Sequence, residues 1–243
     1  MIVLQKYKET GKIGKEEMAV LHHAIMEGLP YQYVSEDDIE SISSIPEVSL
    51  FVGSVEGTRM ALDALGKNLP LPNYYPEALT KFLGRHIEVG TIANVISRIA
   101  SGERVFAKPV DQWKSWTGQV FSESEGFSIL SQLDKSTKVW LAEEIEFESE
   151  FRVYVTNGKV VSIDQYSGDV DREINTDSIT EAIGLLKSDD YHTDTYAFDW
   201  GLTKSGDLLL VEMNDAFAIG KYFKISNKEY YEFLHARWQS MTK

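Results

Sequence analysis

Three side chains whose oxygen atoms could bind a metal ion lie in the last third of the chain: Asp199, Glu212 and Asn214. The apolar run Leu208–Val211 precedes Glu212 and predicts a strand buried on both faces, joined by a turn to an earlier strand that carries Asp199. Because side chains alternate along a strand, Glu212 and Asn214 share a face, and antiparallel pairing would bring Asp199 near both. Two carboxylates and an amide oxygen suit Mg²⁺. Solvated acids are also common at strand ends, so spacing alone leaves both interpretations open.

Two cations lie on predicted strands in the middle of the chain. Arg104–Ala107 predicts a strand that delivers Lys108, and a polar loop, Asp111–Gly118, follows it. Backbone amides near the end of this loop could face phosphate oxygens. The same sequence would also fit a Trp-bearing hairpin that is simply packed. Arg152 lies in a run that Asn157-Gly158 turns into a predicted hairpin. Alternation places Arg152 on the same face as Glu150.

Composition limits the class of protein. The 243 residues include 38 acidic and 24 basic side chains, for a formal charge of -14. This charge argues against general nucleic-acid or anionic-membrane binding, and the absence of cysteine excludes disulfide, thiol and cysteine-zinc chemistry. No apolar run approaches the roughly 18 residues of a membrane span, and the first residues lack the apolar core of a signal peptide. We therefore expect a cytoplasmic protein.

The flanking sequence predicts the elements that must position these residues. A βαβα pattern at the start indicates a small open α/β domain. Its expected elements, and those later in the chain, are strands at Ile2–Leu4, Tyr31–Val34 and Val48–Gly53, and helices at Lys15–Glu27, Thr58–Leu65, Thr91–Ala100, Asp177–Lys187 and Asn227–Trp238. Leu69–Pro76 is a proline-rich connector. We expect Asn227 to be the N-cap of the last helix.

In this order, the parts resemble the nucleotide-binding core of the ATP-grasp superfamily. The features that carry the resemblance are Lys108 before a Gly-containing loop, Val139–Glu144 as an apolar strand entering an acidic segment, Glu150-Phe151-Arg152, and Asp199 with Glu212-Met213-Asn214. They span about half of the chain. Lys108-Pro109, the loop from Lys114 to Gly118 and Asn214–Tyr222 also resemble a clade of small bacterial and phage ATP-grasp proteins marked by one Arg and two Lys.

The resemblance implies an α+β ATP-grasp fold whose nucleotide cleft lies between two subdomains. A pre-ATP-grasp α/β domain at 1–75 would precede a small subdomain with linker helices at 76–145 and a C-terminal subdomain at 146–243. Two departures bear on the acceptor side. The loop 111–118 has a single glycine, and Asp215-Ala216-Phe217 replaces the Ser-Pro-Gly run of many ligases.

The resemblance also implies a role for each matching residue, with ATP and Mg²⁺ bound in the cleft. Lys108, Lys114 and Arg152 would be the catalytic cations on the phosphates, and Asp199, Glu212 and Asn214 would hold Mg²⁺. The remaining nucleotide contacts would come from Thr117, Gly118, Glu143, Glu144, Ile145, Glu146 and Glu150, the last of these on the ribose.

The activity implied is ATP-dependent ligation of a carboxylate to an amine through an acylphosphate. Two alternatives stay open: a kinase of the same fold, and a nucleotide-binding protein without turnover. The carboxylate and amine substrates are unknown, and Arg85, Arg98, Lys221 and Tyr222 are candidate contacts for them. Monomer and homodimer both stay open.

Overall fold

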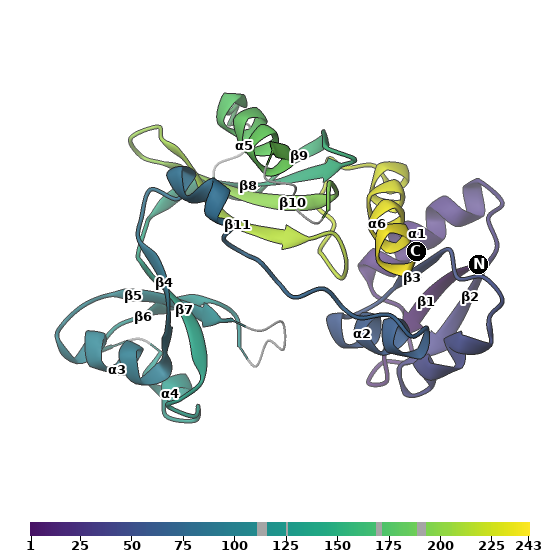
Figure 1. The fold of residues 1–243 in the computed structure, drawn as a ribbon, viewed down its shortest axis with the longest axis horizontal. Coiled ribbons are helices and arrows are strands. Elements are labelled where there is room, and N and C mark those ends of the chain that lie inside the picture. Colours follow the sequence, from purple (N-terminus) through teal and green to yellow (C-terminus); the bar gives the residue numbers. More distant parts are fainter. Residues whose placement is uncertain (111–115, 125, 169–171, 189–192) are drawn as a thin grey trace.

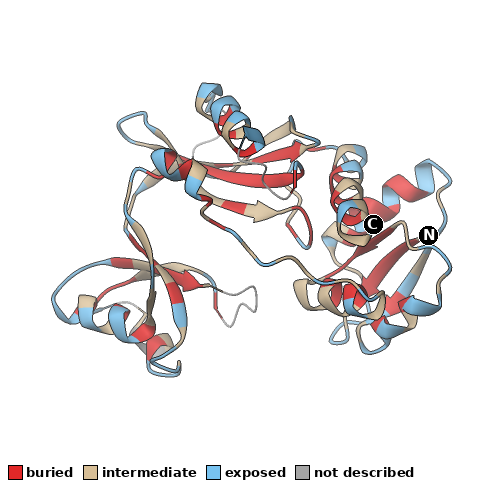
Figure 2. Ribbon diagram, viewed as in Figure 1, coloured by how far each residue is buried: buried red, intermediate tan, exposed pale blue. Residues whose placement is uncertain are grey.

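The computed structural model describes residues 1–110, 116–124, 126–168, 172–188 and 193–243. The described residues form three separate β-sheets (Figure 1). The sheet called the third below comes before the second in the sequence. Buried residues follow the strands, and the helices bury one side each (Figure 2). The chain has the mixed helix-and-sheet architecture expected from its sequence. In the described ranges, no helix is long and apolar enough to cross a membrane.

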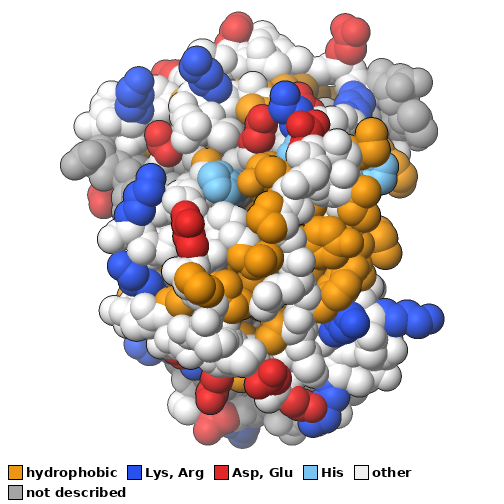
Figure 3. Space-filling view, turned by 90° about the vertical axis from the view of Figure 1, so that its right-hand side faces the viewer, with side chains coloured by type: hydrophobic (Ala, Val, Ile, Leu, Met, Phe, Trp, Pro, Cys, Tyr) orange, Lys and Arg blue, Asp and Glu red, His pale blue; other side chains and the backbone are white. Residues whose placement is uncertain are grey.

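The first sheet is parallel, with strand order β2-β1-β3. Its elements are β1 (Ile2–Lys6), α1 (Lys15–Met26), β2 (Tyr31–Ser35), a 3₁₀ helix (Glu36–Ser44), β3 (Leu50–Val52) and α2 (Val55–Ala64). The predicted βαβα pattern is confirmed. The face carrying this sheet shows hydrophobic side chains to solvent (Figure 3), and the exposed ones on α1 and β2 are Met18, Ile25, Met26, Tyr31 and Tyr33.

The last helix, α6 (Asn227–Thr242), packs on this first sheet. Trp238 Nε1 donates to the Val48 carbonyl at 3.2 Å, and its ring lies 6.1 Å from that of Phe51. The predicted N-cap is wrong by one residue. Ser226 is the N-cap and shares a capping box with Glu229, because its hydroxyl accepts from the amide three residues on.

The second sheet is antiparallel, with order β11-β10-β8-β9. It comprises β8 (Phe147–Thr156), β9 (Lys159–Gly168), β10 (Tyr196–Thr203) and β11 (Leu208–Asp215), and α5 (Asp177–Ser188) and a 3₁₀ helix (Glu77–Phe82) pack against it. Asn157 and Gly158 both have positive φ, 50° and 69°, as the predicted hairpin requires. The expected two-sided burial of β11 is wrong. This strand lies at the sheet edge, and only Leu210 and Met213 are buried in it.

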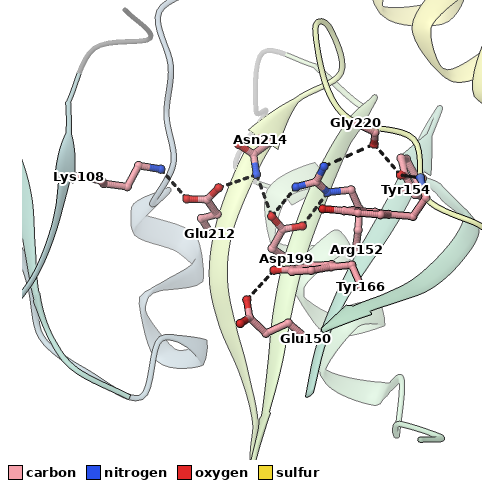
Figure 4. A network of polar contacts seen from close by, with 10 residues as sticks. Lys108, Glu150, Arg152, Tyr154, Tyr166, Asp199, Glu212, Asn214 and Gly220 are labelled. Atoms are coloured by element: carbon pink, nitrogen blue, oxygen red, sulfur yellow. Dashed lines mark hydrogen bonds and ion pairs between the residues drawn. The ribbon is translucent and has the colours of Figure 1, made fainter. Parts of the chain in front are cut away.

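The third sheet is antiparallel, with order β4-β7-β5-β6. Its elements are β4 (Ile87–Thr91), α3 (Ile92–Ala100), β5 (Val105–Pro109), β6 (Gln119–Phe121), α4 (Phe127–Leu130) and β7 (Lys138–Glu143). Lys108 lies within β5, opposite Trp140 of β7. The third sheet therefore presents this lysine toward the second sheet (Figure 4).

Candidate active site

Strand register builds the site on the second sheet. Asp199 of β10 lies directly opposite Glu212 of β11 on one side and Arg152 of β8 on the other. These three side chains therefore form one row across three neighbouring strands, and Asn214 lies two residues beyond Glu212 on the same face (Figure 4). Cross-strand pairing thus places two carboxylates, an amide and a guanidinium together.

Arg152 and Asp199 form a buried ion pair with two parallel hydrogen bonds. The Arg152 Nε donates to Asp199 Oδ1 at 2.8 Å, and a terminal nitrogen donates to Oδ2 at 2.7 Å. Burial alone would lower the pKa of Arg152, but the Asp199 charge and hydrogen bonds raise it on balance, so the guanidinium stays charged. Burial raises the pKa of the Asp199 carboxyl, an effect that Arg152 opposes and Glu212 reinforces.

Lys108 crosses from the third sheet to the second. Its Nζ lies 2.5 Å from Glu212 Oε2 and 3.3 Å from the centre of the Tyr74 ring. An ammonium over an aromatic face is attracted by the electrons of the ring. Tyr74 and Tyr75 come from the proline-rich connector, which the sequence indicated only as a linker. The connector therefore contributes directly to the environment of the lysine.

Asn214 bridges the two acids, because its Nδ2 donates to Glu212 Oε1 at 3.0 Å and to Asp199 Oδ2 at 3.3 Å. Rotation of the amide about its last bond would present the oxygen to the same place. In the described residues, no group of three or more Asp, Glu, His or Cys is arranged to hold a metal. Two carboxylates and one amide nevertheless fit Mg²⁺, which keeps waters and takes phosphate oxygens to complete its octahedron.

The acidic segment between β7 and β8 binds local cations through its side chains. Glu144 pairs with Arg104 at 2.6 Å, which lowers the pKa of the glutamate. Glu146 pairs with Lys204 at 3.0 Å. Residues 144–146 lie outside the strands, so their backbone groups are not used in a sheet ladder. The adenine contacts of Glu144, Ile145 and Glu146 stay a prediction.

Glu150 and Gly118, at the described end of the predicted loop, make different contacts. Glu150 accepts a hydrogen bond of 2.6 Å from the Tyr166 hydroxyl. Gly118 packs so closely that a Cβ there would lie 2.8 Å from Lys108 Cβ. Lys114 lies outside the described residues. Trp116 is buried against Phe121, with ring centres 5.3 Å apart, and so packs the core of the third sheet.

The four residues predicted as candidate substrate contacts lie in different parts of the structure. Arg85 donates to the carbonyls of Leu210 and Val211 and so fixes the edge of β11. Arg98 pairs with Glu88 on the third sheet. Lys221 points its ammonium to the Tyr222 carbonyl. Tyr222 approaches the site most closely, since its ring lies 5.1 Å from the Arg152 guanidinium carbon and stacks on Tyr166.

Sequence reasoning missed Tyr166, and it gave the segment 217–220 no role at the site. The Gly220 carbonyl accepts a hydrogen bond from the Tyr154 hydroxyl at 2.8 Å and lies 3.5 Å from Arg152. Residues 217–220 also line a polar pocket of about 140 Å³ together with Arg152, Glu212 and Asn214. Tyr166 lies two residues beyond Asp164, which is opposite Arg152, and this spacing was the available signal.

Comparison with known families agrees with this architecture. A family model described as an ATP-grasp domain, family 2 of the clade marked by one arginine and two lysines, matches residues 82–233. The chain belongs to this family. A comparison with curated proteins finds no significant match.

Three solved structures share the fold over nearly their whole length. A RimK domain ATP-grasp protein from Sphaerobacter thermophilus has a TM-score of 0.60 at 14% identity, with 100% of both chains covered. D-cycloserine synthetase DcsG has a TM-score of 0.63 at 13% identity, with 99% of each chain covered. D-alanine–D-alanine ligase from Bacillus anthracis has a TM-score of 0.58 at 13% identity, covering 99% of this chain and 96% of the ligase. At such identities the likeness establishes the fold and leaves the substrate to the site.

Proposed function

We propose that this protein is an ATP- and Mg²⁺-dependent ligase that joins a carboxylate to an amine through an acylphosphate. The observation that carries the proposal is the convergence of Lys108 and Arg152, from two different sheets, on the corner formed by Asp199, Glu212 and Asn214. Two cations facing two acids and an amide form a site for a polyanion together with a hard cation. The family of the chain and the ligases among its structural relatives support this class of reaction.

The reaction has two steps. An oxygen of the substrate carboxylate attacks the γ-phosphorus of ATP, the bond from that phosphorus to the ADP oxygen breaks, and an acylphosphate forms. The amine nitrogen then attacks the acyl carbon, the bond to the phosphate oxygen breaks, and the amine proton passes to phosphate or water. Phosphoryl transfer of this kind depends on in-line positioning and charge neutralisation.

The side chains present supply that positioning and neutralisation. When ATP binds, Lys108 exchanges Glu212 for phosphate oxygens, and Arg152 faces the transferred phosphoryl group. Glu212, Asp199 and Asn214 would hold Mg²⁺, which supplies positive charge to the phosphate oxygens. Glu150 would accept hydrogen bonds from the ribose, and backbone groups at 144–146 would bind the adenine. Lys114 and Thr117 remain predicted contacts of the phosphates.

Trapping with hydroxylamine tests this proposal without knowledge of the natural amine. The protein is incubated with ATP, Mg²⁺, hydroxylamine and each of a panel of amino acids and short peptides. We expect hydroxamate together with equal amounts of ADP and free phosphate, and a loss of at least about 100-fold in Glu212→Gln. Glu103→Gln, an exposed acid between α3 and β5, is the matched control. A stable phosphorylated product without free phosphate would indicate a kinase instead. Nucleotide binding without turnover would indicate the third alternative.

A further inference from the structure

An open groove of about 460 Å³ lies between the start of α1 and the segment that leads into α6. Its lining combines two ammonium groups with apolar side chains and an imidazole, and includes Lys15, Met18, His22, Lys221, Tyr222 and Phe223. Among the described residues, no Asp or Glu lines it. The chain as a whole carries a formal charge of -14. The groove is therefore a local basic site on an acidic protein, and it favours an anionic ligand.

The two lysines of the groove lack a close acidic partner. In the described part of the chain, Lys221 forms no ion pair with an acid, and its Nζ donates instead to the Tyr222 carbonyl at 3.1 Å. Lys15 Nζ lies 3.6 Å from Glu16. Burial lowers the pKa of Lys221, an effect that Asp164 opposes and Lys15 reinforces. The two ammonium groups therefore repel each other, and an anion between them would relieve that repulsion.

Large apolar side chains form the rim of the groove. Phe223 is 95% exposed and Met18 is 52% exposed. His22 lies one turn after Met18 on the same face of α1, and its ring contacts the Asn227 amide at 3.2 Å. Exposed apolar surface next to two cations favours a ligand that joins an acidic group to an apolar one. A rim as exposed as this one leaves a bound ligand open to solvent, which suits a segment of extended chain better than an enclosed small molecule.

The groove continues the hollow of the candidate active site along one segment of the chain. Residues 217–220 line the polar pocket beside Arg152, and residues 221–223 line the groove. The Tyr222 ring lies 5.1 Å from the Arg152 guanidinium carbon and 5.7 Å from Lys15 Nζ. One aromatic ring therefore separates a cation of the groove from a cation of the site. Roughly three residues of extended peptide, about 10 Å, span such a separation.

We propose that this groove binds an acidic segment of a peptide substrate. One carboxylate lies between the ammonium groups of Lys15 and Lys221, and a neighbouring apolar side chain packs on Met18 and Phe223. The proposal rests on the ligase function proposed above and names its carboxylate substrate. A second acidic side chain, a few residues along the same peptide, would reach Arg152 and be the one that attacks ATP. The groove thereby selects acidic peptides without taking part in the chemistry.

Direct binding tests the assignment without turnover. The probes are N-acetyl-Glu-Leu-Glu-Leu-Glu-amide and the same peptide with Gln in place of each Glu. Isothermal titration is carried out on the full chain at pH 7 in about 0.15 M salt, which screens exposed charges more than about 8 Å apart. The overall charge of the protein favours the neutral peptide. We nevertheless expect the acidic peptide to bind at least about tenfold more tightly.

Removal of the two lysines should abolish this preference. Lys15→Met combined with Lys221→Met is expected to bind both peptides equally, and each single variant to lose part of the preference. Lys228→Met is the matched control, because this exposed lysine lies in the first turn of α6 outside the lining and approaches Glu232 at 3.9 Å. Equal binding of the two peptides by the natural protein, or an undiminished preference in the double variant, overturns the proposal.

Phe223→Ser separates the apolar contact from the charge. We expect both peptides to bind several-fold more weakly at an unchanged ratio, because this variant keeps both lysines. Unchanged affinities would overturn the apolar contact. Light scattering is measured on the same samples. A dimer of the natural protein that Phe223→Ser converts to a monomer would show that a second copy of the chain covers the groove, which also overturns the proposal.

Two further measurements separate this proposal from the ligase function. AMP-PNP, a non-hydrolysable analogue of ATP, is titrated in parallel with Mg²⁺, and its failure to bind refutes the ligase function while leaving the peptide result readable. With ATP, Mg²⁺ and hydroxylamine, we expect the acidic peptide to give hydroxamate. The variant that lacks both Lys15 and Lys221 should raise the KM for this peptide and leave kcat little changed. Binding of the acidic peptide without hydroxamate refutes it as the substrate.

Discussion

Arg152 and Asp199 lie opposite each other on adjacent antiparallel strands and are joined by two hydrogen bonds of 2.8 and 2.7 Å. Lys108 and Glu212 form a second pair on the same face. Lys108 and Arg152 therefore each neutralise one proposed metal ligand in this structure. In the proposed function, ATP and Mg²⁺ would exchange these pairs for cation–phosphate and metal–carboxylate contacts, which would keep the charges balanced.

Removal of Arg152 tests how strongly the buried pair holds the fold. Arg152→Met leaves the Asp199 carboxylate buried without its partner, and we expect a loss of about 3 kcal/mol in the free energy of unfolding, measured by urea denaturation. Arg172→Met removes an exposed pair with Glu148 and should change stability by less than about 1 kcal/mol. An equally small loss in both variants would contradict the assignment of a buried pair.

Lys108→Met should lower the affinity for nucleotide and raise the affinity for Mg²⁺. The variant loses a cation for the phosphates, so AMP-PNP affinity is expected to fall at least tenfold. It also removes the ammonium that competes with a metal for Glu212, so Mg²⁺ alone should bind more tightly than to the natural protein. Titration calorimetry measures both. Lys138→Met, exposed on β7 of the same sheet, is the control. A parallel loss of metal and nucleotide affinity would show that Lys108 acts by holding the fold.

Gly118 is expected to be required for the position of Lys108. An added methyl would lie 2.8 Å from Lys108 Cβ and 2.9 Å from Phe106 Cζ, so Gly118→Ala must displace the lysine strand. We expect AMP-PNP affinity to fall several-fold. Gly184→Ala is the matched control, because nothing lies within 4 Å of its Cβ, and alanine in a helix should raise stability by about 1 kcal/mol. Unchanged AMP-PNP affinity in Gly118→Ala would mean that this close packing is not needed.

The pH dependence of stability tests the environment of Glu17. Burial raises the pKa of this carboxyl, although the amides around it and Tyr7 oppose the shift and Glu16 adds to it. The folded protein therefore binds this proton more tightly than the unfolded chain, whose carboxyl titrates near about pH 4.3. Stability from the neutral form is present below about that pH and is lost as the pH rises through the folded pKa.

Glu17→Gln stays neutral and escapes this loss. Its stability relative to the natural protein should rise with pH from about pH 4 and then level off, as measured by denaturation at several pH values. The exposed Glu27→Gln should show no such trend. A constant difference for Glu17→Gln across the same range would mean that the carboxyl is solvated in the folded protein.

Periodicity predicted the elements that hold the site, because side-chain alternation is a local property of a strand. Glu212 and Asn214 share a face, and Arg152 shares a face with Glu150, as expected. The predicted role of Lys114 stays a prediction, since that residue lies outside the described ranges. The strand β4 was missed because Ile87–Thr91 is short, contains Gly90 and runs straight into α3.

Contacts between residues far apart in the sequence could not be predicted from the local sequence pattern. Nothing near Tyr74 in the sequence indicates that its ring meets Lys108, because the connector brings the two together only in the folded chain. The edge position of β11 is likewise set by strand order, which determines that Leu209 and Val211 stay half-exposed. The partnership of Glu17 with Tyr7 depends on the turn between β1 and α1.

The docking of α6 on the first sheet has a consequence for how the protein is made. Strand β3 and α6 share one core, with Phe51 against Trp238, although the two elements lie near opposite ends of the sequence. During synthesis, the lobe built on the first sheet therefore lacks part of its interior until the final helix leaves the ribosome. We expect its strands to remain incompletely protected until α6 has emerged, while the other two sheets can close earlier.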